Sequence, residues 1–93
     1  MPVTTQPELI QKESIHNLKF NHKLNVKQHP YLLSQIRNAT RLGNSYRSKV
    51  FILFQDDNGM KKVETTIWAF GEKYICLKGG VWLPIGRIVE IKA

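Results

Sequence analysis

Short runs of β-prone residues, separated by turn residues, dominate the stretch from Lys49 to Ile91. The runs are rich in Val, Ile, Thr, Tyr, Phe and Trp, and they are divided at Asp57-Asn58-Gly59, Gly71-Glu72, Gly79-Gly80 and Gly86-Arg87. This spacing is typical of a meander of antiparallel hairpins. We therefore expect strands at about 50–55, 62–70, 74–78, 81–85 and 88–91.

The first and second of these runs differ in pattern. Residues 50–54 are continuously apolar, which predicts a strand covered on both faces, with a helix packed on one of them. In the second run Val63, Thr65 and Ile67 alternate with other residues and should line the interior. Trp68 and Phe70 would then lie on the other face, where they either cover the N-terminal segment or form a binding platform. Aromatic side chains contribute large buried areas to small cores, which favours the first of these roles.

Two single residues in the later runs carry their own predictions. Pro84 has no N–H to donate, so its strand should be an edge strand or should turn that position to solvent. Cys76, the only cysteine, excludes an intramolecular disulfide and is expected to be a small apolar core residue.

A helix is predicted at about 30–42. Pro30 suits a first helical position, and Gly43-Asn44 suits a left-handed terminator. The apolar stripe of this helix consists of Leu32, Leu33, Ile36, Ala39 and Leu42. Arg37 and Arg41 lie one turn apart on the opposite face, where like charges repel slightly. Either an anionic partner or solvent screening offsets that repulsion.

The rest of the chain divides into an N-terminal arm, residues 1–27, and one domain, residues 28–93, as 93 residues allow. Pro7 to Glu13 could form a short helix. Residues 18–27 alternate apolar and polar, which indicates an edge strand or an arm that orders on a partner. No signal peptide or membrane span is evident, so the cytoplasm is the expected compartment.

Positive charge is concentrated in the first half of the chain. The net charge is +7, and residues 1–49 hold eight basic and two acidic residues, whereas residues 50–93 hold six and five. A polyanion is therefore the first partner to consider.

The order of one helix followed by the five runs resembles small SH3-like and Sm-like barrels. The layout is similar to that of the Hfq family of RNA chaperones. The run from Glu72 to Ile91, EKYICLKGGVWLPIGRIVEI, resembles the closing strands of Rho-binding antiterminators, which bind a protein partner. The resemblance implies a mainly β protein with one helix (α+β), built as a five-stranded barrel preceded by the helix at about 30–42.

The chain departs from these families at three points. The loop Phe70-Gly71-Glu72-Lys73 lacks the Asn of Sm-type RNA sites, and Gly86-Arg87 stands where the chaperones carry a Lys-His pair. Pro84 would remove a donor from the ladder that joins Sm subunits into rings. Only Arg87 is carried over from the resemblance as a site residue, with Lys73 a poorer candidate.

These observations predict a non-enzymatic nucleic-acid-binding protein, with RNA favoured over DNA. Its phosphate contacts would be Arg37, Arg41, Arg47, Lys49 and Arg87, and its stacking surfaces Trp68, Tyr74 and Trp82. The alternative is a regulatory adaptor that binds a protein partner through the barrel edge. No cofactor or metal is expected, because His16, His22 and His29 have no metal-ligand spacing, and the oligomeric state stays open.

Overall fold

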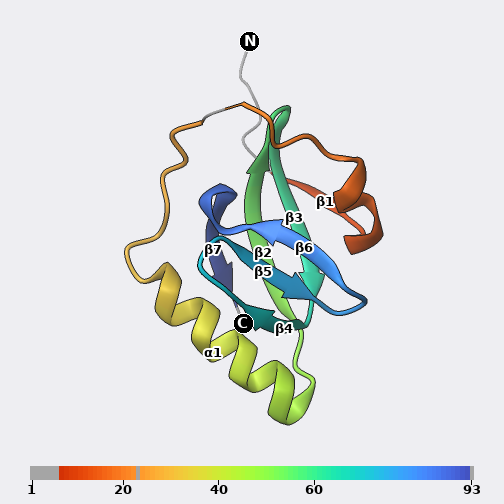
Figure 1. The fold of residues 1–93 in the computed structure, drawn as a ribbon, viewed down its shortest axis with the longest axis vertical. Coiled ribbons are helices and arrows are strands. Elements are labelled where there is room, and N and C mark those ends of the chain that lie inside the picture. Colours follow the sequence, from red (N-terminus) through yellow and green to blue (C-terminus); the bar gives the residue numbers. More distant parts are fainter. Residues whose placement is uncertain (1–6, 23, 93) are drawn as a thin grey trace.

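The computed structural model describes residues 7–22 and 24–92, which form one α-helix, two short 3-10 helices and seven strands in two sheets (Figure 1). In chain order the elements are β1 (Glu8–Ile10), η1 (Lys12–Asn17), α1 (Leu32–Tyr46), β2 (Val50–Asp56), β3 (Gly59–Thr65), β4 (Ile67–Phe70), β5 (Tyr74–Leu77), β6 (Val81–Pro84), η2 (Ile85–Arg87) and β7 (Ile88–Lys92). The strand-like runs of the sequence therefore fall on strands of the structure.

The larger sheet has the strand order β1-β3-β2-β7. β2 pairs antiparallel with both β3 and β7, whereas β1 lies parallel to β3. Val50, Ile52 and Phe54 of β2 are buried, while Phe51 between them is exposed. The prediction that both faces of this strand are covered was wrong, because α1 packs mainly against β4 and β7.

The smaller sheet has the order β4-β5-β6 and is antiparallel throughout. Its inner face is formed by Ile67, Ile75, Leu77 and Leu83, all fully buried. β6 is an edge strand, which confirms the placement predicted from Pro84. Val63, Thr65 and Ile67 are buried as predicted, although they belong to two strands that separate at Thr66.

The predicted closed five-stranded barrel is wrong. β3 pairs with β2, and after Thr66 the chain changes partner, so that β4 pairs with β5 in the second sheet. Closure would require β6 to pair with β7, and the outer edge of β7 is already occupied. The His29 N–H donates to the Val89 carbonyl (2.7 Å), and the Ile91 N–H donates to Gln35 Oε1 (2.9 Å).

α1 differs from its predicted limits at both ends: it begins at Leu32 and not at Pro30, and it does not end at Gly43. The helix continues to Tyr46, and Arg47 takes the left-handed cap conformation (φ 55°), its N–H donating to the Gly43 carbonyl. Gly43 is instead buried against β4: a Cβ there would lie 2.6 Å from the Ile67 carbonyl oxygen. The glycine permits close helix packing rather than termination. Leu33, predicted on the apolar stripe, is 60% exposed.

The N-terminal region also differs from its prediction. Residues 7–13 form β1 and the start of η1 instead of a helix, and residues 18–22 and 24–27 form no strand. Ile15 of η1 is buried in the core, and η1 packs against both β6 and β3. The described part of the arm is therefore integral to the fold.

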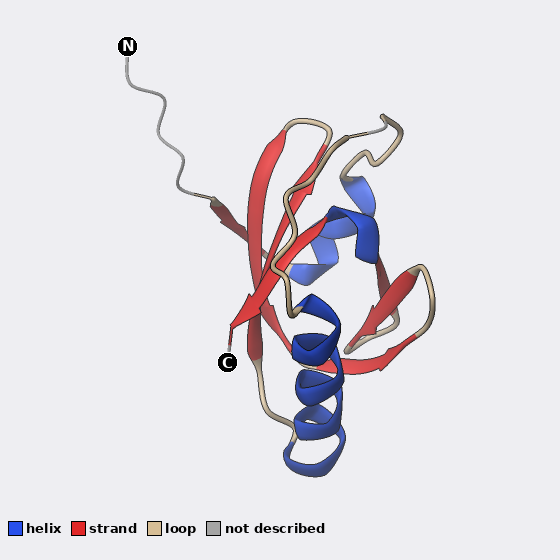
Figure 2. Ribbon diagram, turned by 90° about the vertical axis from the view of Figure 1, so that its left-hand side faces the viewer, coloured by secondary structure: helices blue, strands red, loops and turns tan. Residues whose placement is uncertain are grey.

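The hydrophobic core lies between the two sheets and is completed by α1 and η1. Leu32, Ile36 and Ala39 of α1 join the inward residues of both sheets in one buried cluster. Figure 2 shows α1 at one end of the molecule, with the two sheets extending away from it. This arrangement leaves the outer face of β4-β5-β6 open beside the C-terminal end of α1.

Candidate functional site

The cations predicted on the helix and in the connection after it are all exposed. Arg37 and Arg41 lie on the outer surface of α1, and Arg47 and Lys49 lie between α1 and β2. Arg37 and Asn44 are seven residues apart, so they share one flank of the helix. These cations stand where an external anion can reach them.

Arg87 has a different position, because its side chain is only 8% exposed. Its guanidinium donates to Asp57 Oδ1 (2.8 Å), to the Gln55 carbonyl (3.2 Å) and to the His22 carbonyl, and it lies 5.6 Å from the centre of the Phe20 ring. Its two terminal nitrogens thus donate to groups of the protein itself. The structure therefore corrects the expectation of a phosphate contact at Arg87 and gives this residue a structural role.

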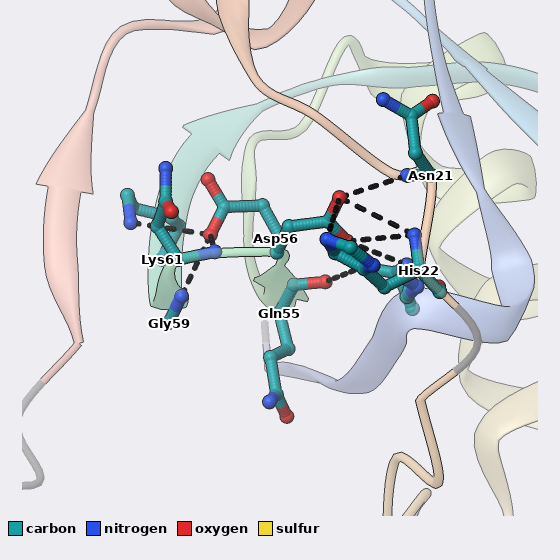
Figure 3. Close-up of polar contacts among 9 residues, drawn as sticks. Asn21, His22, Gln55, Asp56, Gly59 and Lys61 are labelled. Atoms are coloured by element: carbon teal, nitrogen blue, oxygen red, sulfur yellow. Dashed lines mark hydrogen bonds and ion pairs between the residues drawn. The ribbon is translucent and has the colours of Figure 1, made fainter.

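Asp57 is the anionic centre of this contact. Besides Arg87, its carboxylate accepts the N–H groups of Asn21 (2.9 Å) and His22 (3.3 Å; Figure 3). The N–H of Asp57 itself donates to the Lys19 carbonyl (2.9 Å). Burial opposes ionisation of the carboxyl, but the Arg87 hydrogen bond and the two backbone donors outweigh it and lower the pKa of Asp57. Residues 19–22 are thereby fastened to the β2–β3 turn.

The neighbouring Asp56 holds the same turn from inside. Its Oδ1 accepts the N–H groups of Asn58 (2.9 Å) and Gly59 (2.8 Å) and lies 3.4 Å from Lys61 Nζ (Figure 3). Lys61 also lies 3.8 Å from Glu8 Oε1 of β1. Asp56 is fully buried, and its second oxygen has no hydrogen-bond partner among the described residues. Both aspartates therefore stabilise the turn, as its sequence predicts.

A pocket of about 330 Å³ lies where the end of α1 meets the smaller sheet. We call it the helix-end pocket; it is lined by Gly43, Asn44, Arg47, Thr66, Trp68 and Lys78. Two cations and one aromatic side chain thus meet in one pocket, and in the part of the chain that the structure describes no carboxylate lines it. Of these, Arg47 and Trp68 were predicted as site residues, and Lys78 was missed.

The backbone fixes this pocket at three points. The close approach of Gly43 to Ile67 sets the helix end against β4, and the left-handed conformation of Arg47 turns the chain immediately afterwards. The Lys78 N–H donates to the Thr66 carbonyl (2.9 Å), which fixes the start of the β5–β6 turn beside β4. Lys78 could have been found from its alternation with Tyr74 and Cys76, which places all three on one face.

The outer face of β4-β5-β6, which we call the sheet face, continues from this pocket. Cys76 pairs with Trp82 on one side and with Ala69 on the other, and Tyr74 lies two residues along β5. Trp68, Tyr74 and Trp82 are 46%, 48% and 58% exposed. The three aromatic residues predicted as stacking surfaces are therefore accessible, on the same side as Lys78.

Two predictions about this face need correction. Trp68 and Phe70 do not cover the N-terminal segment, because their side chains are 46% and 41% exposed. Cys76 is half-buried on the sheet face rather than in the core, since Ile75 and Leu77 on either side of it point inward.

Within residues 7–22 and 24–92, no group of three or more His, Cys, Asp or Glu side chains is arranged to hold a metal ion. In the same part of the chain, no helix has the length and apolar character needed to cross a membrane. Comparison of the chain with protein-family models, curated protein sequences and solved structures gave no match.

Proposed function

We propose that this protein binds single-stranded nucleic acid without catalysis, RNA in preference to DNA, through the helix-end pocket and the sheet face. The observation that carries the proposal is the meeting of Trp68 with Arg47 and Lys78 in one pocket, without a carboxylate among its described lining residues. Proteins that bind single strands combine cations that follow the backbone with aromatic side chains on which bases stack. Single-stranded RNA and single-stranded DNA both offer unpaired bases, so the preference for RNA is tested below with matched oligonucleotides.

The distribution of charge supports an anionic partner. Asp56 and Asp57, two of the seven acids, are used in internal pairs with Lys61 and Arg87. Each pair neutralises one positive and one negative charge, so the remaining side chains still carry the whole net charge of +7. A surface with this excess attracts polyanions and raises their association rate.

In the proposed complex one base stacks on Trp68, and the adjoining phosphates are held by Arg47 and Lys78. Arg37, on the same helix flank as Asn44, and Arg41 and Lys49 would contact phosphates further along the strand. Phosphate contacts fix the position of the strand, and stacking tolerates every base because each has a π face.

A protein partner is the second candidate, and one observation favours it. β6 is an edge strand, and Trp82 on it is more than half exposed, so a partner strand could pair there and cover the indole. The affinity for such a protein partner would depend weakly on salt concentration. The affinity for a nucleic acid held through its phosphates falls steeply as salt is added.

The test is fluorescence anisotropy with a labelled single-stranded RNA, the matched single-stranded DNA and a duplex DNA at low and moderate salt. Trp68→Ala should weaken binding of the single-stranded RNA by about 1–3 kcal/mol, the usual range for one stacked base. Tyr31→Ala is the control, because Tyr31 is also an exposed aromatic residue (69%, against 46% for Trp68) and lies at the far end of α1. Absence of binding at low salt, where electrostatic attraction is strongest, would overturn the proposal.

A further inference from the structure

A second groove opens beside the other end of the sheet face, between the β5–β6 hairpin and the N-terminal segment. It measures about 450 Å³, and we call it the arm groove. Its walls include His16, Lys19 and Phe20 from the N-terminal segment and Tyr74, Trp82 and Pro84 from the hairpin. The helix-end pocket does not share these residues, so the groove is a separate site on the same face.

The chemistry of the arm groove repeats that of the helix-end pocket. Two exposed aromatic side chains, Tyr74 and Trp82, stand opposite Lys19 and His16, and within residues 7–22 and 24–92 no carboxylate lines the groove. The one acid of η1, Glu13, is engaged by Lys12 at 2.7 Å. A ligand with an aromatic ring and an anionic group therefore fits both faces of the groove.

The inner wall of the groove is held in place by the buried Asp57–Arg87 pair. Asp57 accepts the N–H groups of Asn21 and His22, and Arg87 donates to the His22 carbonyl and lies against the Phe20 ring. Because these bonds go to the backbone, they fix the path of residues 19–22 whatever their side chains do. The groove is thus preformed, which reduces the entropy lost on binding.

One short single-stranded oligonucleotide can reach both sites. Tyr74 of the arm groove begins β5, and Lys78 of the helix-end pocket directly follows it. Four residues of extended chain separate them, which corresponds to about 13 Å at the usual rise per residue. Trp82 pairs with Cys76, midway between them. No side chain of the smaller sheet between the sites carries a negative charge.

We propose that the arm groove binds a second nucleotide of the same single strand, with its base against Trp82 and Tyr74 and its phosphate beside Lys19. This inference rests on the proposed function and extends it, because it assigns the ligand a path from the helix-end pocket across the sheet face. Occupation of both sites by one strand raises the affinity above that of either site, since the second contact becomes intramolecular.

The test uses the fact that Trp68 and Trp82 are the only two tryptophans of the chain. Trp68→Phe leaves Trp82 as the sole indole emitter in the arm groove, and Trp82→Phe leaves Trp68 in the helix-end pocket. Phenylalanine retains a stacking face, so both variants should still bind an oligouridine of about ten nucleotides. We expect saturable quenching of indole emission in both variants at the same RNA concentrations.

A second measurement addresses charge. Lys19→Gln should lower the slope of log affinity against log salt by about 0.7, the value for one phosphate contact on a single strand. Lys92→Gln is the control, because Lys92 is an exposed lysine on β7, outside both sites.

The outcomes separate the two proposals. Quenching of Trp68 but not of Trp82, with an unchanged salt slope in Lys19→Gln, would overturn the second subsite while the first stands. If neither variant shows quenching and the intact protein does not bind RNA at low salt, the proposed function itself is overturned. Quenching of both indoles with the reduced slope supports the shared path.

Discussion

A Cβ atom placed on Gly43 would lie 2.6 Å from the carbonyl oxygen of Ile67 and 2.8 Å from Thr66 Cγ2. Both distances are shorter than a carbon atom can accept without movement of its surroundings, and the nearer atom belongs to the backbone of β4. Contact between the end of α1 and the smaller sheet therefore depends on a glycine within the helix. The helix-end pocket is built on this contact.

Gly43→Ala should destabilise the protein, although alanine favours helix formation by about 1 kcal/mol over glycine. The clash with the Ile67 carbonyl must push α1 away from β4, at a cost of about 1–3 kcal/mol. Urea unfolding measures the difference. Ser45→Ala, at an exposed position of the same helix, should leave stability unchanged or raise it slightly. A more stable Gly43→Ala protein would contradict the close packing.

Asp57→Asn should remove a stabilising contribution that depends on pH. Because Arg87 and the amides of Asn21 and His22 lower the folded-state pKa of Asp57, its contribution is present above the unfolded-state pKa, about 3.9, and is lost as pH falls through the folded-state value. The difference in urea midpoint between wild type and Asp57→Asn should therefore be largest near neutral pH and shrink below pH 4 or so. The unfolded-state pKa of Asp57 lies within the range from about pH 7 to about pH 3. If the difference in urea midpoint stayed constant over this range, the stabilising role of the ionised Asp57 would be contradicted.

Lys61→Met should destabilise the fold strongly, because it leaves the fully buried Asp56 carboxylate without its cation. Breaking a buried pair on one side typically costs about 3–5 kcal/mol. The adjacent Lys62 offers a matched control, since it lies on the other face of β3, 5.2 Å from the centre of the Phe51 ring. Chemical denaturation should show a much smaller loss for Lys62→Met. Equal losses would show that the buried carboxylate does not need Lys61.

Arg37→Glu separates the two explanations for the paired arginines of α1. A glutamate one turn before Arg41 replaces repulsion by attraction, so the helix should gain about 0.3–0.5 kcal/mol in thermal unfolding. RNA affinity should fall in the same variant if Arg37 contacts phosphate. A gain in stability with unchanged affinity would assign the two arginines to the solvated surface alone.

The parts of the fold that sequence predicts are those governed by local rules. Turn residues such as Asn58 and Gly79 locate the hairpins, the alternation of Val63, Thr65 and Ile67 identifies the buried face of the sheet, and the missing N–H of Pro84 locates an edge strand. Each of these signals acts within a few residues, so no knowledge of distant partners is needed.

The predictions that failed depend on partners far along the chain. Glycine is the residue that most often ends a helix. Only the close approach of Gly43 to Ile67 shows why the helix continues past it. Arg87 looks like a surface cation until its pairing with Asp57, thirty residues earlier, is known. The outer edge of β7, which would have to pair with β6 in a closed barrel, bonds instead to His29 and Gln35, more than fifty residues earlier in the chain.

The candidate site was predicted in its residue types and only partly in its arrangement. Trp68, Tyr74 and Trp82 are exposed on one side, and Arg47 lies beside Trp68. Lys78 and Lys19 were both missed. The alternation of Lys78 with Tyr74 and Cys76 could have revealed Lys78. Lys19 lies in a segment without regular structure, so its contribution emerges only when the groove that it lines is located.

The salt dependence of RNA binding in Arg47→Gln/Lys78→Gln tests the central claim most directly. If both cations hold phosphates beside Trp68, the slope of log affinity against log salt should become shallower by about 1.4, two contacts at about 0.7 each. Lys62→Gln/Lys92→Gln removes the same charge from the outer face of the larger sheet and should leave the slope unchanged. Equal slopes for wild type and Arg47→Gln/Lys78→Gln would contradict nucleic-acid binding at the helix-end pocket.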